Sequence, residues 1–333
     1  MTTVFVSHPQ GKLAHYFGDR ATAALQAVAQ VRFNPTDNDL SSAELAALAQ
    51  DCDAIVSYRQ TVGDEALFAA LPALKAFVRC AIDIRNIDVA SASRHGVLVT
   101  QASAGFVASV SEWIVGTMID LGRHISASAA LYHAGQPVAP VMGRELRGGT
   151  LGVIGYGQIS RYLCDVALAL GMRVIVHDPH ASTGRADLEQ VGLDALLSQS
   201  DFVACLAPAN EATENMMNAA AFAAMQPHAF FINASRGNLV DEDALLAALD
   251  AGTIAGCALD VGRAPDQMPS PRVAAHPRAI ATPHIGGLTP PAVEHQAMET
   301  VAQLAEIFQG RVPKGAVNAA EAYRWQKAFG QRG

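Results

Sequence analysis

A glycine-rich turn near the middle of the chain constrains the fold more than any other feature. Residues 151–160 read LGVIGYGQIS, in which an apolar run leads into Gly155 and Gly157 and an amphipathic stretch follows. Glycines at these positions allow a tight turn and a close approach of the backbone to an anion. The segment predicts a strand, a turn and a helix that bind a pyrophosphate, with Gln158 and Ile159 beginning the helix.

An acidic residue at a fixed distance makes this turn more specific. Asp178 lies 23 residues after Gly155, at the end of the apolar run 173–177. A carboxylate at this spacing accepts both hydroxyls of an adenosine ribose and repels a 2′-phosphate, so NAD is favoured over NADP. Arg185 is near enough in sequence to attract such a phosphate, which leaves strict NAD preference open. The third glycine of the fingerprint is replaced by Ser160, which is small enough for close helix–strand packing.

Short apolar runs alternate with amphipathic stretches along the chain, which predicts parallel sheets covered by helices. A length of 333 residues favours two domains. The predicted strands are 4–7, 54–57, 75–80, 97–100, 150–154, 173–177, 202–205, 229–233, 254–259 and 279–281. The predicted helices are 21–30, 43–50, 65–71, 108–124, 158–170, 193–199, 219–224, 241–251 and 290–309, and segment 135–149 is predicted to be loop-rich.

Composition narrows the functional class. Half the residues are apolar and about a sixth are charged, which favours large buried cores. The net charge of −8 argues against nucleic acid as a partner. Five widely spaced cysteines without a CxxC pattern predict free thiols, with no disulfide framework and no metal site. The N-terminus has no signal-peptide pattern and no apolar run is long enough to span a membrane, so a cytoplasmic location is expected.

Three further blocks each follow a predicted strand. They are Asn233-Ala234-Ser235-Arg236-Gly237, Ala258-Leu259-Asp260-Val261 and Thr282-Pro283-His284-Ile285-Gly286-Gly287. Together with the glycine-rich turn and Asp178, these blocks resemble the D-isomer-specific 2-hydroxyacid dehydrogenase family over nearly the whole chain. The order and spacing of four blocks are far more specific than any single one.

The resemblance implies a fold and an assembly. Two Rossmann-like α/β domains with parallel sheets are expected, with the nucleotide domain inserted into a flavodoxin-like substrate domain. The substrate domain would consist of 1–103 and 289–333, and the NAD-binding domain of 104–288. The family commonly forms homodimers through the nucleotide domain. Its NAD site implies roles for Ala234, Ser235 and Gly287, and for Asp260 as hydrogen-bond partner of the nicotinamide carboxamide.

The chemistry of these enzymes assigns two further residues. Moving a hydride between NAD and a small 2-hydroxy or 2-keto acid needs a group that accepts and returns a proton, and His284 suits this role because imidazole titrates near neutral pH. It also needs a permanent cation that binds the carboxylate in two-point fashion and polarises the carbonyl, and Arg236 suits it. Both residues lie in loops just after predicted strands.

One departure from the family pattern affects the catalytic histidine. The family usually places a Glu five residues after the position of Asp260, where it pairs with the histidine and raises its pKa. This chain has Pro265 there, followed by Asp266 and Gln267. We expect Asp266 to be the partner of His284, with Gln267 as the fallback, since an amide orients an imidazole without a negative charge.

A second departure lies in the first domain. The family has a glycine-rich loop here whose backbone amides bind the substrate carboxylate, and the matching residues are Ala81 and Ile82. Ala81 and Asp83 stand in place of the two glycines. Asp83 either repels a second acidic group of the substrate or pairs with Arg79 or Arg85. Substrate identity and reaction direction are therefore open.

Two alternatives remain. Some relatives use the nucleotide site to sense NAD(H) as transcriptional corepressors, without turnover. A formate-type dehydrogenase would place Gln beside the histidine, but Gln267 stands two positions too late for that pattern.

Overall fold

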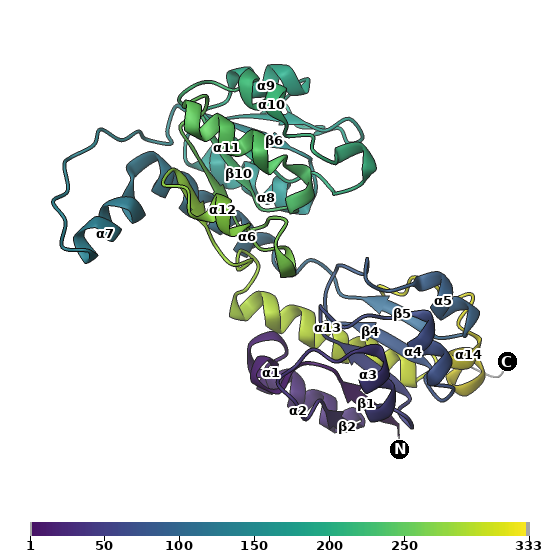
Figure 1. Cartoon of the computed structure of the whole chain (residues 1–333). Coiled ribbons are helices and arrows are strands. Elements are labelled where there is room, and N and C mark those ends of the chain that lie inside the picture. The colour runs from purple at the N-terminus through teal and green to yellow at the C-terminus, as the bar shows by residue number, and fades with distance from the viewer. Residues whose placement is uncertain (1, 331–333) are drawn as a thin grey trace. The chain divides into compact units, whose positions relative to one another are not determined.

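The computed structural model describes residues 2–330, apart from the side chain of Asp266. It divides into two compact units. Unit 1 contains the chain up to Phe106 and from Pro290 onward, and unit 2 is Val107–Thr289. Each unit is built on one parallel sheet, which confirms the predicted fold class (Figure 1).

The sheet of unit 1 has five parallel strands in the order β2-β1-β3-β4-β5. Their bounds are β1 (Thr3–Val6), β2 (Gln30–Phe33), β3 (Ala54–Ser57), β4 (Ala76–Arg79) and β5 (Leu98–Gln101). The helices are α1 (Gln10–Tyr16), α2 (Asp19–Val28), α3 (Ser42–Leu48), α4 (Glu65–Ala70), α5 (Val89–Arg94), α13 (Pro290–Phe308) and α14 (Tyr323–Phe329).

Alternating side chains of these strands fill two separate cores. On one face, Val4 and Val6 pack in a cluster with Leu25 of α2 and Leu304 of α13. On the other face, Phe5 packs in a cluster with residues of α3 and α4. Helices therefore cover both faces, as parallel sheets require. The closing helix α13 lies directly against α2 and β4.

The sheet of unit 2 has seven strands in the order β12-β11-β10-β9-β6-β7-β8. Their bounds are β6 (Thr150–Ile154), β7 (Arg173–His177), β8 (Glu189–Gln190), β9 (Phe202–Cys205), β10 (Phe230–Asn233), β11 (Gly256–Leu259) and β12 (Ala279–Ala281). The α-helices are α6 (Val107–Arg123), α7 (Ile125–His133), α8 (Gln158–Ala169), α9 (Leu193–Gln199), α10 (Ala219–Ala224), α11 (Glu242–Ala251) and α12 (Pro271–Ala274).

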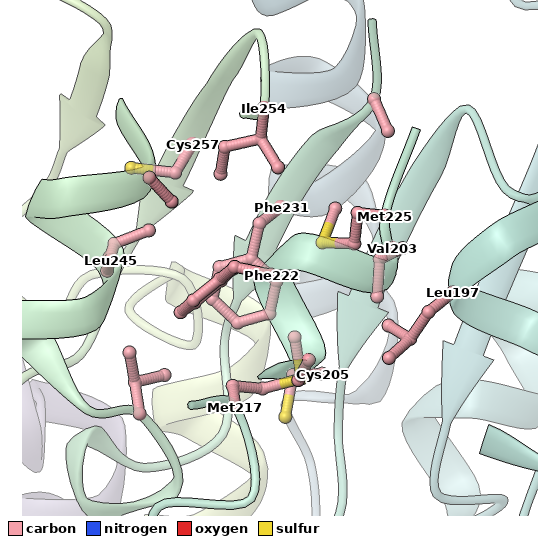
Figure 2. Close-up of a cluster of buried hydrophobic side chains, with 14 of the residues drawn as sticks. Leu197, Val203, Cys205, Met217, Phe222, Met225, Phe231, Leu245, Ile254 and Cys257 are labelled. Atoms are coloured by element: carbon pink, nitrogen blue, oxygen red, sulfur yellow. The ribbon is translucent and has the colours of Figure 1, made fainter. Parts of the chain in front are cut away.

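One large core lies between this sheet and helices α9, α10 and α11. Its centre is an edge-to-face pair of Phe222 from α10 and Phe231 from β10, with ring centroids 5.4 Å apart. Figure 2 shows these rings surrounded by aliphatic and sulfur-containing side chains. All five cysteines, Cys52, Cys80, Cys164, Cys205 and Cys257, are buried free thiols, as predicted. Within residues 2–330, no helix is long and apolar enough to cross a membrane.

An arm extends from unit 2. Helix α7 buries none of its residues, and the long loop that follows it projects away from the sheet (Figure 1). Tyr132, Val141 and Met142 are 68%, 64% and 94% exposed. The sequence predicted a loop-rich segment over 135–149, which follows α7. It did not predict α7 itself, because a helix without a buried face has no apolar periodicity.

The structure corrects several element bounds. The helix predicted for 21–30 ends at Val28, because Ala29 is extended and Gln30 begins β2 beside Thr3. This edge strand alternates between exposed and half-buried side chains, so it lacks the apolar run that marked the central strands. The two-residue strand β8 was missed for the same reason. Asp241 caps helix α11, because its side chain accepts hydrogen bonds from the N–H groups of Asp243 and Ala244.

Candidate active site

The first predicted glycine lies between the carboxyl ends of the neighbouring parallel strands β6 and β9. The chain leaves these two strands toward opposite sides of the sheet. Gly155 follows β6, has a φ of +88°, and donates its N–H to the carbonyl of His177. A Cβ on this residue would lie 2.7 Å from the Cα and 2.8 Å from the N of Ala207, which follows β9. Only glycine fits both the dihedral angle and the space. The gap between β6 and β9 is the switch point at which sheets of this order bind ligands.

The second glycine leaves its surroundings open. A Cβ on Gly157 would meet no atom within 4 Å, and no side chain caps the N-terminus of α8 at this residue. The first amides of α8, from Gln158 and Ile159, are thus free of a capping side chain, as an anion site requires. Ser160, in place of the third glycine, is buried at 1% exposure, so close packing of the helix is retained.

Asp178 lies beside this turn, at the end of β7. Its carboxylate accepts the N–H of Tyr156 at 2.7 Å and the N–H groups of His180 and Ala181 at 2.8 and 2.9 Å. Burial alone would raise the pKa of Asp178, but these backbone hydrogen bonds more than offset it and lower the pKa. The side chain is therefore an anion that retains acceptor capacity for hydroxyl groups.

Arg185 is held by two carboxylates. Its guanidinium donates to Asp187 at 2.6 Å and also binds Asp165. A cation with two acidic partners has less positive charge to offer a 2′-phosphate. This pairing favours NAD over NADP, because Arg185 is less available to attract a 2′-phosphate.

The loop that carries Arg236 is fixed by a buried asparagine. Asn233 ends β10 with no exposed surface, accepts the N–H of Ser235 at 3.0 Å, and donates its amide to the carbonyl of Arg236 at 2.9 Å. The Ser235 hydroxyl donates to the carbonyl of Ala207 at 2.6 Å. Ala234, Ser235 and Arg236 are thus tied to the residue that packs against Gly155.

A second buried acid fixes the loop that carries His284. Asp260 follows β11 and is 3% exposed. One of its oxygens accepts the hydroxyl of Thr282 at 2.6 Å and the N–H of Ile285 at 2.8 Å, and the other accepts the N–H of Gly286 at 2.7 Å. His284 itself has a φ of +57°, a conformation that costs energy for a non-glycine residue. Asp260 therefore maintains an unfavourable backbone geometry at the histidine.

These loops converge through the order of the strands. β10, β11 and β12 are adjacent and parallel, so their carboxyl ends share one edge. Arg236 and His284 each lie three residues past their strands, with Asp260 between them. Because neighbouring strands are about 4.8 Å apart, the two loops begin about 10 Å from each other. Gly287 lies at the end of the His284 loop.

The loop at 262–268 differs from the family pattern and is firmly attached. Arg263 donates its guanidinium to Glu214 at 2.8 Å and to the carbonyl of Asn238 at 3.0 Å. Gln267 has a φ of +57°, and its side-chain oxygen is buried without a hydrogen-bond partner among the described residues. The side chain of Asp266 lies outside the part that the structure describes, so its predicted pairing with His284 stays a prediction.

The predicted substrate-binding residues of unit 1 lie in the loop after β4. Ala81 is half-buried, and Ile82 is 37% exposed. Asp83 and Arg85 form an ion pair with an Oδ2–Nη2 distance of 2.8 Å. Of the two partners weighed for Asp83, the structure thus supports Arg85.

Comparison with known proteins agrees with this geometry. Residues 115–286 match the model of the NAD-binding domain of D-isomer specific 2-hydroxyacid dehydrogenases. A D-3-phosphoglycerate dehydrogenase of Synechocystis is 34% identical over 300 residues, covering 88% of this chain and 53% of that protein. A hydroxypyruvate reductase of Thermotoga maritima is 31% identical, covering 81% of this chain and 89% of that protein. The chain belongs to the D-isomer-specific 2-hydroxyacid dehydrogenase family.

A solved structure extends the likeness to the whole fold of such dehydrogenases. The apo-structure of D-lactate dehydrogenase from Escherichia coli has a TM-score of 0.82 and 24% identity, covering 95% of this chain and all of that one. The chain spans only about half the length of several phosphoglycerate dehydrogenases that it matches.

The residues present fit the NAD of this family. Gly155 permits the close turn, Gly157 leaves open space beside the uncapped amides of α8, and Asp178 offers an anionic acceptor at the neighbouring strand. Sequence reasoning missed the roles of Asn233 and Thr282. Their signal was available, because a polar residue at the end of a buried strand has to find a partner.

Proposed function

We propose that this protein is an NAD-dependent dehydrogenase that transfers a hydride between NAD(H) and a small D-2-hydroxy acid or its 2-keto acid. The observation that carries the proposal is the shared sheet edge at which Arg236, Asp260 and His284 follow adjacent strands. Unit 2 would bind the cofactor and unit 1 the substrate. Relatives named for 3-phosphoglycerate and hydroxypyruvate share this class of substrate.

His284 and Arg236 would act on the substrate. In the direction of reduction, the His284 imidazolium donates its proton to the carbonyl oxygen as C2 gains the hydride, and in oxidation the imidazole takes the proton back. Arg236 binds the carboxylate with its planar guanidinium and polarises the carbonyl. Ala81 and Ile82 would offer backbone amides to a substrate carboxylate. When bound, the cofactor would supply the hydride as NADH or accept it as NAD.

Gly155, Gly157, Gln158 and Ile159 would surround the pyrophosphate, and Asp178 would accept the ribose hydroxyls. Ala234, Ser235 and Gly287 would border the nicotinamide. Asp260 accepts three hydrogen bonds from the loop that carries His284 and, as a carboxylate, has room for about one more. It would therefore hold the His284 loop and accept the carboxamide N–H with the remaining lone pair.

Asp266 is the proposed partner of His284. A carboxylate beside the imidazole stabilises its charged form and raises its pKa. Asp266→Asn should therefore shift the His284 limb of the pH–rate profile to lower pH. Gln267→Leu, which removes the fallback amide, should leave that limb in place. A shift with Gln267→Leu and none with Asp266→Asn would assign the pairing to Gln267.

An NADH-oxidation screen tests the proposed activity. Glyoxylate, hydroxypyruvate, pyruvate and longer branched 2-keto acids would be offered with NADH and with NADPH. We expect turnover of at least one acid, with NADH preferred. Tight NADH binding without turnover of any acid would contradict the proposal and favour an NAD(H)-sensing role, for which the named relatives provide no support.

We further propose a homodimer formed through unit 2. The arm exposes apolar side chains of Tyr132, Val141 and Met142, and a second copy would bury both arms by two-fold symmetry. Light scattering should give twice the mass of one chain. Met142→Lys should weaken the dimer, whereas Val312→Lys, at an apolar site in unit 1 that is 58% exposed, should not. The buried free thiols are consistent with a cytoplasmic location, which we also propose.

A further inference from the structure

The loops that follow β10 and β11 meet backbone to backbone. Gly237 comes directly after Arg236, and a Cβ on Gly237 would overlap the Cα, the carbonyl carbon and the carbonyl oxygen of Gly262. Only glycine allows an approach this close. Because Gly262 begins the loop 262–268, the backbone next to Arg236 packs directly against the loop that carries Asp266.

The loop 262–268 is closed on itself by backbone hydrogen bonds. The N–H of Gly262 donates to the carbonyl of Gln267 at 2.8 Å, and the N–H of Ala264 donates to the carbonyl of Met268 at 3.0 Å. Gln267 has a φ of +57°, which costs energy for a residue with a side chain. Backbone strain of this kind persists only where the surrounding structure holds it. The loop therefore needs a firm attachment to its neighbours.

Arg263 provides this attachment. Its Nη2 donates to Glu214 Oε1 at 2.8 Å, to the side-chain oxygen of Asn215 at 2.5 Å and to the carbonyl of Asn238 at 3.0 Å. Its Nε donates to the carbonyl of Val240 at 3.2 Å. Asn238 and Val240 belong to the turn that directly follows the Arg236 loop. A guanidinium donates several hydrogen bonds in fixed directions, which suits it to join separate segments.

Glu214 completes the hydrogen-bond network. Its second carboxylate oxygen accepts the side-chain amide of Asn238 at 2.8 Å. Hydrogen bonds from Arg263 and then Asn238 lower the pKa of Glu214, so its carboxyl group is an anion at neutral pH. The side chains of Arg263 and Glu214 are 37% and 41% exposed. Because an ion pair this exposed adds little to stability, its role is better explained by the geometry that it imposes on the two loops.

We propose that Arg263 is a positioning residue for the proposed reaction. It joins the loop of Arg236 to the loop of Asp266, so that the group proposed to bind the substrate carboxylate and the proposed partner of His284 keep a fixed spacing. Arg263 acts through the backbone of both loops and not on the substrate. The inference rests on the proposed function, because it assigns Arg263 a part in the reaction that Arg236 and His284 would carry out.

Removal of the guanidinium tests this inference. Arg263→Met keeps the apolar stem and loses the hydrogen bonds. We expect kcat/KM for the preferred 2-keto acid to fall about 10- to 100-fold, since small displacements of positioned groups cost this much. NADH affinity should be unchanged, and the His284 limb of the pH–rate profile should shift to lower pH, as in Asp266→Asn. Arg272→Met, which breaks the exposed pair of Arg272 and Asp243 in the same unit, is the matched control and should change none of these.

A double variant distinguishes positioning from a general loss of structure. If Arg263 acts through Asp266, then Arg263→Met should cause no further shift of the limb in the Asp266→Asn protein. If Gln267→Leu is the variant that moves the limb, the same cycle is measured with it. Arg263→Lys keeps the charge without the planar fork and should retain an intermediate activity, so it tests the inference if Arg263→Met does not fold.

Hydrogen exchange gives a measurement that does not depend on turnover. In Arg263→Met, exchange should rise together in 237–240 and 262–268, and a rise confined to 262–268 would overturn the inference. Wild-type kinetics and an unmoved pH limb in Arg263→Met would overturn it as well, and so would a full further shift in the double variant. Failure of the wild type with every 2-keto acid would instead count against the proposed function.

Discussion

In both sheets of this protein the polar groups lie at the carboxyl ends of the strands, but the two edges are built differently. In unit 2 the backbone builds most of the edge, because Gly155 permits a close contact with Ala207, Gly157 is exposed, and Asn233 and Asp260 hold loops by hydrogen bonds to the backbone. In unit 1 the edge consists of side chains, with Arg79 and His8 buried beneath it. The edge of unit 2 therefore depends on backbone dihedral angles, and the edge of unit 1 depends on charged side chains.

This difference predicts how easily each edge can change its ligand. A backbone site for pyrophosphate suits any substrate, since it contacts only the cofactor. A side-chain site can change its ligand with a few substitutions. Asp83, which stands where the family has glycine, is such a change, and its charge is paired with Arg85.

The largest effect is expected where unit 2 departs from this comparison, at the side chains proposed to be catalytic. His284→Asn should lower kcat by about 10²–10⁴-fold, since it removes the proton donor but leaves the NADH site in place. Steady-state kinetics and NADH fluorescence measure the two effects. His15→Asn, an exposed histidine of α1, is the matched control. If His284→Asn lost NADH affinity by as large a factor as kcat, the residue would act in cofactor binding and not in proton transfer.

Removal of Asp178 tests whether cofactor choice also depends on one side chain. Asp178→Ser should weaken NADH binding by about 10- to 100-fold, because hydrogen bonds between a carboxylate and the ribose hydroxyls are lost. NADPH binding should improve or stay level, since the repulsion of its 2′-phosphate disappears. Titration with both coenzymes measures the ratio. An unchanged ratio would exclude Asp178 as the determinant.

The two glycines are expected to affect different properties, Gly155 the stability of the fold and Gly157 the binding of NADH. Gly155→Ala should lower the free energy of unfolding by about 1–3 kcal/mol, because its positive φ and the contact with Ala207 both oppose a Cβ. Gly157→Ala should leave stability unchanged and weaken NADH binding, since its Cβ would enter open space. Chemical denaturation and NADH titration distinguish the two. Equal stability of both variants would contradict the close approach at Gly155.

The last expected effect concerns the side-chain edge of unit 1 and appears only as the pH is lowered. Burial, and to a lesser degree Arg79, lowers the pKa of His8 to about 3 in the folded protein, against a usual value of 6.5. Between these values the unfolded state binds the extra proton, so stability is complete above pH 6.5 and falls as the pH drops. The contribution is about 1.4 kcal/mol per pH unit in that window. His8→Gln should flatten this slope in denaturant titrations from pH 7 to pH 4, and an unchanged slope would exclude His8 as its source.

The sequence predicted the backbone-built edge better than the side-chain edge. Strand bounds at 150–154, 173–177 and 202–205 agree with the structure, since fully buried parallel strands are continuous apolar runs. The glycine turn was readable because its spacing is set by geometry. The buried residues His8 and Arg79 of unit 1 were not, because they lie at the ends of two different strands, β1 and β4, and come together only through the sheet order. The arm helix α7 was hidden because none of its residues is buried.

The central claim is that His284 and Arg236 act on an acid at which NADH delivers a hydride. Incubation with NADH deuterated at both C4 positions, followed by mass and chiral analysis of the product, tests it directly. The account predicts a D-2-hydroxy acid with one deuteron at C2, formed by the wild type and not by Arg236→Gln. A product without deuterium, or equal transfer by Arg236→Gln, would contradict it.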